Sequence, residues 1–171
     1  MKAEAIHFSD DGDIPNNRLP LIFYAGALSP SADTASAFES LFHENGWGDG
    51  WRYTVYPFHH YHSNVHEALG VAAGTAELRL GGEAHGRTVS VKPGDAVLIP
   101  AGVGHKRVSS CNDFLVVGAY VLGANPPGTE RDLLREGAEG KARIRARILQ
   151  VAIPRTDPVA GIAGPLHEFW K

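Results

Sequence analysis

Four of the nine histidines in this 171-residue sequence lie within eight residues, and this group carries the clearest chemical signal. It comprises His59, His60, His62 and His66, and Glu67 follows directly. Imidazole and carboxylate groups together suit borderline divalent metals such as iron, manganese, nickel, copper and zinc. The sequence therefore predicts a site for one divalent transition metal ion, with Fe, Mn, Ni or Zn as candidates.

Strand geometry explains how these side chains could share one ion. Successive side chains on a strand point to opposite faces, so His60 and His62 would point the same way. Glu67 follows after a short turn and is a plausible third ligand. His105 stands far along the chain, and the turn-forming segment 100–104 would have to bring it back. The expected metal ligands are His60, His62, Glu67 and His105.

The same alternation nominates residues that could line a cavity beside the metal. The residues an even number of positions from His60 or His105, which would point to the same face, include Arg52, Thr54, Tyr56, Phe58 and Arg107. An arginine facing the interior is costly unless it is paired, so an arginine here could anchor a substrate carboxylate or phosphate. Arg52, Tyr56 and Arg107 are therefore candidate substrate contacts. In the alternative interpretation, either arginine forms a salt bridge at the mouth of the cavity.

The two remaining histidines of the cluster are expected to point away from the interior. His59 is out of phase with the ligand pair, and His66 is adjacent to Glu67. A register shifted by one residue would instead turn His59 inward and let His66 replace Glu67. Three nearby aromatic residues are interpreted as core or interface side chains: Phe42, Trp47 and Trp51.

Hydrophobic spacing outside the cluster predicts one helix and many short strands. Apolar residues recur at helical spacing between Ala32 and Glu44, with Ser31 or Asp33 as the N-cap and Gly46 as the stop. From residue 51 the period approaches two, and glycine-rich turns separate the segments. The expected strands are Trp51–His62, Glu67–Ala73, Glu77–Leu80, Thr88–Val91, Ala96–Ile99, His105–Ser109 and Phe114–Leu122.

The two ends of the chain are less regular. An irregular lead precedes Leu21–Tyr24, a short apolar run that could pair at a sheet edge. Glu130–Arg135 could form a helical turn, and residues 144–153 could be either a last strand or a helix. The segment from Asp157 to Lys171 is too apolar for a free end, so it should pack on the same barrel or on a partner subunit.

The spacing of these residues resembles the two motifs of the cupin family, and the wider context resembles uncharacterised bacterial single-domain cupins. The first motif is matched by His60, His62, Glu67 and Gly74. The second is matched by Gly94, Pro100, Gly102 and His105. The asparagine that usually follows the last histidine after three residues is Ser109 here, and that asparagine is not a ligand.

This resemblance, which covers residues 51 to about 122, implies an all-β fold. It implies a jelly-roll barrel (a double-stranded β-helix) with one helix on the N-terminal side and irregular terminal segments. We expect a 1–50 extension whose strand and helix pack on the barrel, and a 51–123 barrel core that carries both motifs. The 124–171 extension is expected to pack on the barrel or on a partner subunit.

Composition narrows the class of protein. A chain that is 43% hydrophobic can bury one sizeable core, and its length suits one domain. The net charge of -3 comes from interspersed charges, so neither nucleic acid nor an anionic membrane is an expected partner. Cys111 is the only cysteine, and no apolar run resembles a secretory signal or a membrane span, which favours the cytoplasm.

Two functions fit an open metal site of this kind. Three histidines and one carboxylate leave one or two positions of a six-coordinate metal for a small-molecule ligand. The leading hypothesis is an enzyme of oxygenase or isomerase type, in which Glu67 tunes the metal or acts as a base. The alternative is a non-catalytic module that binds a sugar or carboxylate through the metal. A purely structural site is disfavoured because such sites are usually closed. By analogy with related barrels, and because of the apolar tail, a homodimer is expected.

Overall fold

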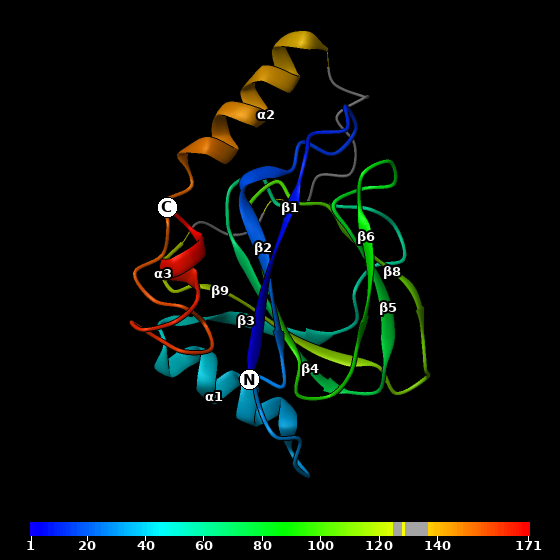
Figure 1. Cartoon of the computed structure of the whole chain (residues 1–171), viewed down its shortest axis with the longest axis vertical. Coiled ribbons are helices and arrows are strands. Elements are labelled where there is room, and N and C mark those ends of the chain that lie inside the picture. The colour runs from blue at the N-terminus through cyan, green and yellow to red at the C-terminus, as the bar shows by residue number, and fades with distance from the viewer. Residues whose placement is uncertain (125–127, 129–136) are drawn as a thin grey trace.

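The computed structural model describes residues 1–124, 128 and 137–171, and it consists of two antiparallel sheets with three helices (Figure 1). The larger sheet has the strand order β1-β2-β7-β4-β9-β3 and the smaller sheet has the order β6-β5-β8. This arrangement confirms the all-β, jelly-roll class. The strands are β1 (Lys2–Phe8), β2 (Asn17–Ala25), β3 (Trp47–Tyr53), β4 (Glu67–Ala73), β5 (Ala76–Leu80), β6 (Arg87–Val91), β7 (Ala96–Ile99), β8 (His105–Ser110) and β9 (Leu115–Val121).

Six of the seven expected strands are confirmed to within a residue at each end, from β4 to β9. The first expected strand is wrong in extent. β3 begins at Trp47 and ends at Tyr53, and the chain then runs irregularly until an isolated bridge joins His60 to His105. Pro57 lies in this irregular stretch and has no N–H to donate to a ladder, which is one reason that the strand does not continue.

The N-terminal segment is more regular than expected. Lys2–Phe8 is a strand, β1, where an irregular lead was predicted, and Ile6 and Phe8 alternate into the core. The run Leu21–Tyr24 is the middle of β2, which lies between β1 and β7 and not at an edge. Both segments therefore belong to the larger sheet.

The larger sheet is covered on both faces. Leu69 and Val71 of β4 face the barrel interior, where they pack with residues of the smaller sheet. Ala68 belongs to a second cluster on the outer face. Gly70 also faces outward, and a Cβ there would lie 2.4 Å from the ring of Phe38. The lack of a side chain at Gly70 therefore lets a helix pack directly on the sheet.

That helix is α1 (Thr34–Glu44), and it agrees with the helix expected from the sequence. The side chain of Asp33 accepts a hydrogen bond from the backbone N–H of Ser36 at 3.1 Å, so Asp33 is the N-cap. Gly46 has a φ of 79°, a left-handed conformation that ends the helix at little cost. α1 contacts β3, β4 and β9, which positions it over the outer face of the larger sheet.

The C-terminal segment packs on its own barrel, which was one of the two expected arrangements. α2 (Ala138–Gln150) shows that most of the ambiguous segment 144–153 is helical, and a short helix, α3 (Leu166–Phe169), follows. Trp170 is buried and its indole N–H donates to the carbonyl of Pro20 at 2.8 Å. Because the tail is buried within one chain, it no longer argues for a partner subunit, and the homodimer stays a prediction.

The helical turn expected at Glu130–Arg135 lies outside the described residues. None of the helices in residues 1–124 and 137–171 combines the length and the apolar character needed to cross a membrane.

A buried carboxylate, Asp157, fastens the tail. It accepts hydrogen bonds from the hydroxyl of Tyr24 at 2.6 Å and from the backbone N–H groups of Val159, Ala160 and Leu166 at 2.8–2.9 Å. Burial and this carboxylate raise the pKa of the Tyr24 phenol well above its usual range, so the phenol stays protonated and donates.

We expect Asp157→Ala to lower the free energy of unfolding by about 3–5 kcal/mol, because several buried donors would lose their acceptor at roughly 1–3 kcal/mol each. Urea denaturation followed by circular dichroism measures this change. Glu168→Ala, at an exposed position in the same tail, is the matched control and should leave stability within about 0.5 kcal/mol. Equal effects of the two substitutions would contradict the role of Asp157.

Candidate metal centre

The first two histidines of the site face each other across a short backbone pairing. The N–H of His60 donates to the carbonyl of His105 at 3.2 Å, and the N–H of His105 donates to the carbonyl of His60 at 3.0 Å. Residues opposed in this way present their side chains on the same face. The two ring centroids are accordingly 4.1 Å apart.

Alternation then places His62 beside them, as the sequence indicated. The intervening residue, Tyr61, points the other way and is fully buried in a cluster with Ile144 and Ile148 of α2. The carbonyl of His62 accepts a hydrogen bond from the N–H of Gly102 at 2.8 Å. The histidine segment is thus pinned to the segment that precedes β8, with α2 packed behind it.

A tight turn returns His105 to the site. The N–H of Val103 donates to the carbonyl of Pro100 at 3.1 Å, and Gly102 has a φ of 85°. A positive φ at the third position of a four-residue turn defines type II geometry, which glycine adopts without strain. The expected return of the chain at residues 100–104 is therefore made by this turn.

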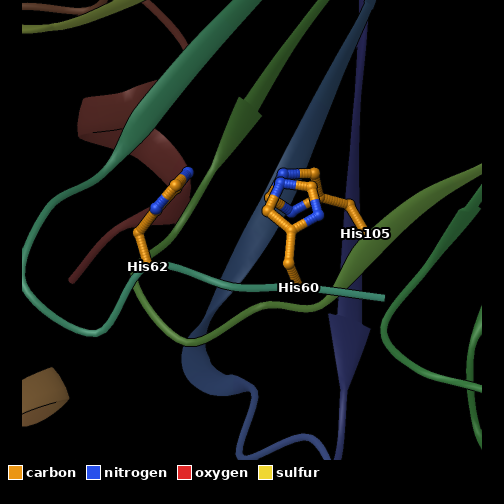
Figure 2. A group of neighbouring side chains, drawn as sticks. All are labelled: His60, His62 and His105. Atoms are coloured by element: carbon orange, nitrogen blue, oxygen red, sulfur yellow. The ribbon is translucent and has the colours of Figure 1, made fainter. Parts of the chain in front are cut away.

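The three imidazoles form a compact group (Figure 2). One ring nitrogen from each of His60, His62 and His105 lies within 4.8 Å of the others, and all three residues are buried. Figure 2 shows the rings on the same side of their backbones, with His62 set apart from the closely spaced rings of the other two. The ring centroid of His62 is 5.7 Å from that of His60 and 5.9 Å from that of His105.

Backbone carbonyls set the tautomer of each ring. Nδ1 of His60 lies 3.4 Å from the carbonyl oxygen of Phe58. Nδ1 of His62 lies 2.8 Å from that of Gly128, and Nδ1 of His105 lies 3.2 Å from that of Val103. A carbonyl can only accept, so Nδ1 carries the proton and Nε2 carries the lone pair. Histidines that bind metals are usually oriented in this way by a partner at the second nitrogen.

His60 is neutral at ordinary pH. Burial and the neighbouring His105 lower the pKa of His60 to about 3. A neutral imidazole is the form that can donate a lone pair to a metal ion.

Glu67, the first residue of β4, brings a carboxylate to the same group. Its Oε2 atom lies 3.3 Å from Nε2 of His105 and 3.5 Å from Nε2 of His62, and its side chain is 2% exposed. Burial raises the pKa of Glu67, but its interactions with the adjacent His62 and His105 lower it by more, so the net shift is downward. Glu67 is therefore a carboxylate.

The Oε2 atom of Glu67 is the observation that tests whether a metal fits. It is buried, and no residue that the structure describes hydrogen bonds to it. Its lone pairs and those of the facing Nε2 atoms converge, an arrangement that is stable only if positive charge lies between them. A donor set of three imidazole nitrogens and one carboxylate oxygen matches the preference of iron, manganese, nickel and zinc. The residues present therefore fit a divalent transition metal.

Two residues that sequence reasoning missed hold the carboxylate in place. The hydroxyl of Tyr120 donates to Oε1 of Glu67 at 2.9 Å, and the indole N–H of Trp51 donates to the Tyr120 oxygen at 3.0 Å. Tyr120 and Glu67 are directly opposed on β9 and β4. Burial and the Glu67 charge raise the pKa of Tyr120 above its usual range, so it keeps the proton it donates.

Trp51 reaches this position because Gly118 has no side chain. A Cβ at Gly118 would lie 2.3 Å from the Trp51 ring. Trp51 packs against the core, in agreement with its interpretation as a core or interface residue, and its half-buried ring also lies beside the site. Phe42 and Trp47 are core residues as expected. The only sequence signal for the pairing of Tyr120 with Glu67 was strand register, which periodicity alone does not supply.

A pocket of about 360 Å³ opens beside the four candidate ligands. Apart from Thr54, its other walls are aromatic and aliphatic, and they comprise Trp51, Tyr53, Thr54, Val55, Tyr56, Leu69 and Tyr120. This volume lies at the lower end of the range typical of small-molecule sites. The site can therefore admit a small organic molecule next to the metal position.

The three candidate substrate contacts have different outcomes. Tyr56 lines the pocket, while Arg52 and Arg107 do not. Arg52 lies on the outside, paired with Glu39 at 2.6 Å, and Arg107 donates to the carbonyl of Val55 at 3.1 Å. The parity argument fails for Arg52 because regular strand structure ends at residue 53, so alternation cannot be carried from His60 back to Arg52.

His59 and His66 lie outside the histidine group, in agreement with their expected phase. Nε2 of His59 is 3.4 Å from Glu83. Nδ1 of His66 accepts the backbone N–H of Ala101 at 3.0 Å, and its ring packs against Trp170. The register in which His66 replaces Glu67 is therefore not the one adopted.

The chain is similar to known proteins in sequence. A family model described as Cupin domain matches residues 54–110. The uncharacterised protein YjlB of Bacillus subtilis (strain 168) is 41% identical over 170 residues, which covers 99% of this chain and 97% of that protein.

Solved structures with a similar arrangement share little sequence with this chain. Acireductone dioxygenase from Bacillus anthracis, with a cadmium ion in its active centre, has a TM-score of 0.40 and 12% identity over 61% of this chain and 72% of its own. Oxalate decarboxylase from Bacillus subtilis, described with Mn(II) centres, has a TM-score of 0.41 and 17% identity over 70% of this chain and 30% of its own.

We expect Tyr120→Phe to lower the free energy of unfolding by about 1–3 kcal/mol, because Oε1 of the buried Glu67 carboxylate would lose its donor. Urea denaturation in the presence of a chelator measures this cost without a contribution from metal. Tyr53→Phe is the matched control, since Tyr53 is 61% exposed and lies at the same pocket. A loss for Tyr120→Phe no greater than that for Tyr53→Phe would contradict the role of the hydroxyl.

Proposed function

Since this chain belongs to the cupin family, we propose that it is a metal-dependent enzyme of oxygenase or isomerase type that acts on a small polar organic molecule. His60, His62, Glu67 and His105 are the proposed ligands of one divalent ion. The candidates for that ion are Fe, Mn, Ni and Zn. The cytoplasm is the expected location.

One observation carries this proposal: a buried Glu67 oxygen without a hydrogen-bond partner among the described residues faces two histidine nitrogens at the wall of a pocket. A structural site would have little use for an adjoining pocket of about 360 Å³. Three nitrogens and one oxygen would leave two positions of a six-coordinate ion for a small molecule in that pocket.

A bound divalent ion would supply Lewis acidity or, if it is redox-active, activation of dioxygen. The residues of the chain have separate tasks. The carbonyls of Phe58, Gly128 and Val103 hold the three imidazoles in the tautomer that presents Nε2. Tyr120 fixes one oxygen of Glu67 and leaves Oε2 directed at the histidines.

Glu67 is also the proposed base. It is the only carboxylate among the described residues that line the pocket, so it would take a proton from a substrate if it detached from the ion. Val55 and Leu69 line the pocket nearby and would limit the access of water to that proton transfer.

We expect the purified protein to hold about one transition metal ion per chain, and His60→Ala and His105→Ala to lose it. Removal of a ligand should weaken metal binding by more than the roughly 10–100-fold that loss of an outer partner typically costs. Elemental analysis after dialysis, followed by chelator competition, measures both quantities.

His85→Ala is the matched control for this experiment, because His85 is exposed and is not part of the described pocket lining. It should retain the metal content of the unaltered protein. Equal metal content in His60→Ala, His105→Ala and the unaltered protein would overturn the assignment. If metal is retained but no compound in a panel of catechols, thiols and diketones is converted, with or without oxygen, the non-catalytic binding function replaces the enzyme.

A further inference from the structure

We infer that the pocket takes a flat chelating molecule of at most one negative charge, and that it rejects dianions such as dicarboxylates and phosphate monoesters. This inference rests on the proposed function, because it concerns what binds beside the metal. It adds a class of ligand to the site, and the charges and shapes of the pocket walls carry it.

The pocket walls that the structure describes contain no compensating cation. Among the described residues that line it, none is lysine or arginine, and the only acidic residue is Glu67. The remaining polar groups are the three candidate histidine ligands, the Thr54 hydroxyl, the tyrosine hydroxyls and the Trp51 indole N–H. A phosphate or a second carboxylate would therefore meet hydroxyl groups and carbon but no fixed positive charge.

The nearest arginines identified from the sequence are engaged elsewhere. The Arg52 guanidinium donates to both carboxylate oxygens of Glu39 at 2.6 Å and to Ser36 at 2.9 Å. Arg107 donates to the carbonyl of Val55 at 3.1 Å and to the Ser110 hydroxyl at 2.9 Å. For either arginine to reach a ligand, these bonds would have to break.

Charge balance at the metal then sets a limit on the ligand. A divalent ion together with the Glu67 carboxylate carries a net charge of about +1, since the three histidines are neutral as ligands. A singly charged chelator neutralises this site, whereas a dianion leaves one negative charge in a pocket with aliphatic and aromatic walls. Such a charge is costly when it is neither paired nor fully hydrated.

The shape of the walls favours a flat molecule with an apolar body. Trp51 and Tyr120 are linked by a hydrogen bond on one side of the site. Tyr56 is stacked on Phe58 with 5.0 Å between ring centroids and meets the ring of His60 edge-on at 5.1 Å. These contacts orient the aromatic rings, so the apolar part of a flat ligand would pack against them.

The experiment titrates three chelators into protein loaded with Co(II), whose visible absorption reports a change of ligands directly. Tropolone is flat and singly charged when bound, acetohydroxamate is singly charged without a ring, and oxalate is doubly charged; all three bind through oxygens that close a five-membered chelate ring. Each dissociation constant is divided by that of the same compound for aqueous Co(II). This ratio removes the intrinsic strength of the chelator.

We expect the normalised affinity to fall in the order tropolone, acetohydroxamate, oxalate, with at least about a tenfold step between the last two. The charge argument is tested separately by Thr54→Lys, which places a cation at a half-buried position in the pocket wall. This variant should strengthen oxalate binding by about tenfold or more and leave acetohydroxamate within about threefold. Thr54→Gln is its matched control of similar length and should change neither.

Each outcome separates this inference from the proposed function. If the unaltered protein does not retain Co(II), the proposed metal site fails and the inference fails with it. If Co(II) is retained and oxalate binds as well as acetohydroxamate, or none of the three compounds changes the spectrum, the inference alone is overturned. If Thr54→Lys and Thr54→Gln affect oxalate equally, the absence of a cation is not the basis of selection.

Discussion

The Glu67 carboxylate lies entirely inside the barrel, and a buried charge is tolerated only if its surroundings compensate for the water it has lost. Tyr120 supplies a hydrogen bond to one oxygen, and the histidine group faces the other. Most other features of the site follow from this requirement. Strand β9 must place Tyr120 opposite Glu67, and the chain must return at residues 100–104 to place His105 beside it.

The rest of the fold keeps those strands in register. The larger sheet is buried on both faces, by the smaller sheet on the inside and by α1 and the C-terminal tail on the outside. A one-residue slip of β4 would turn Glu67 outward and Ala68 inward, and it would expose Leu69 and Val71 to the outer layer. Packing on two faces therefore protects the position of a single carboxylate.

Much of this arrangement was accessible from the sequence, for identifiable reasons. Period-two alternation and glycine turns located β4 to β9, because short strands between tight turns leave a local signal. The cap at Asp33 and the stop at Gly46 located α1 for the same reason. The grouping of His60 with His62 followed from alternation, which holds even where the backbone forms only an isolated bridge.

Other features depended on contacts between segments that are distant in sequence. Counting alternate residues back from His60 gave the wrong face for Arg52, because the stretch after Tyr53 is not a regular strand. Arg52 lies outside the pocket and is paired with Glu39. β1 has too little apolar character to be recognised alone, and its pairing with β2 makes it a strand.

The sequence by itself thus determined the candidate ligands and their alternation, because these depend on neighbours along the chain, and its two motifs indicated the class of fold through their resemblance to a known family. Only the tertiary structure decided that Tyr120 and Trp51 support Glu67, that Arg52 and Arg107 do not line the pocket and that the tail covers its own barrel. Each of those outcomes depends on contacts between residues far apart in sequence. Strand register, burial and available space decide which contacts form, and Gly118 is an example because its lack of a side chain leaves room for Trp51.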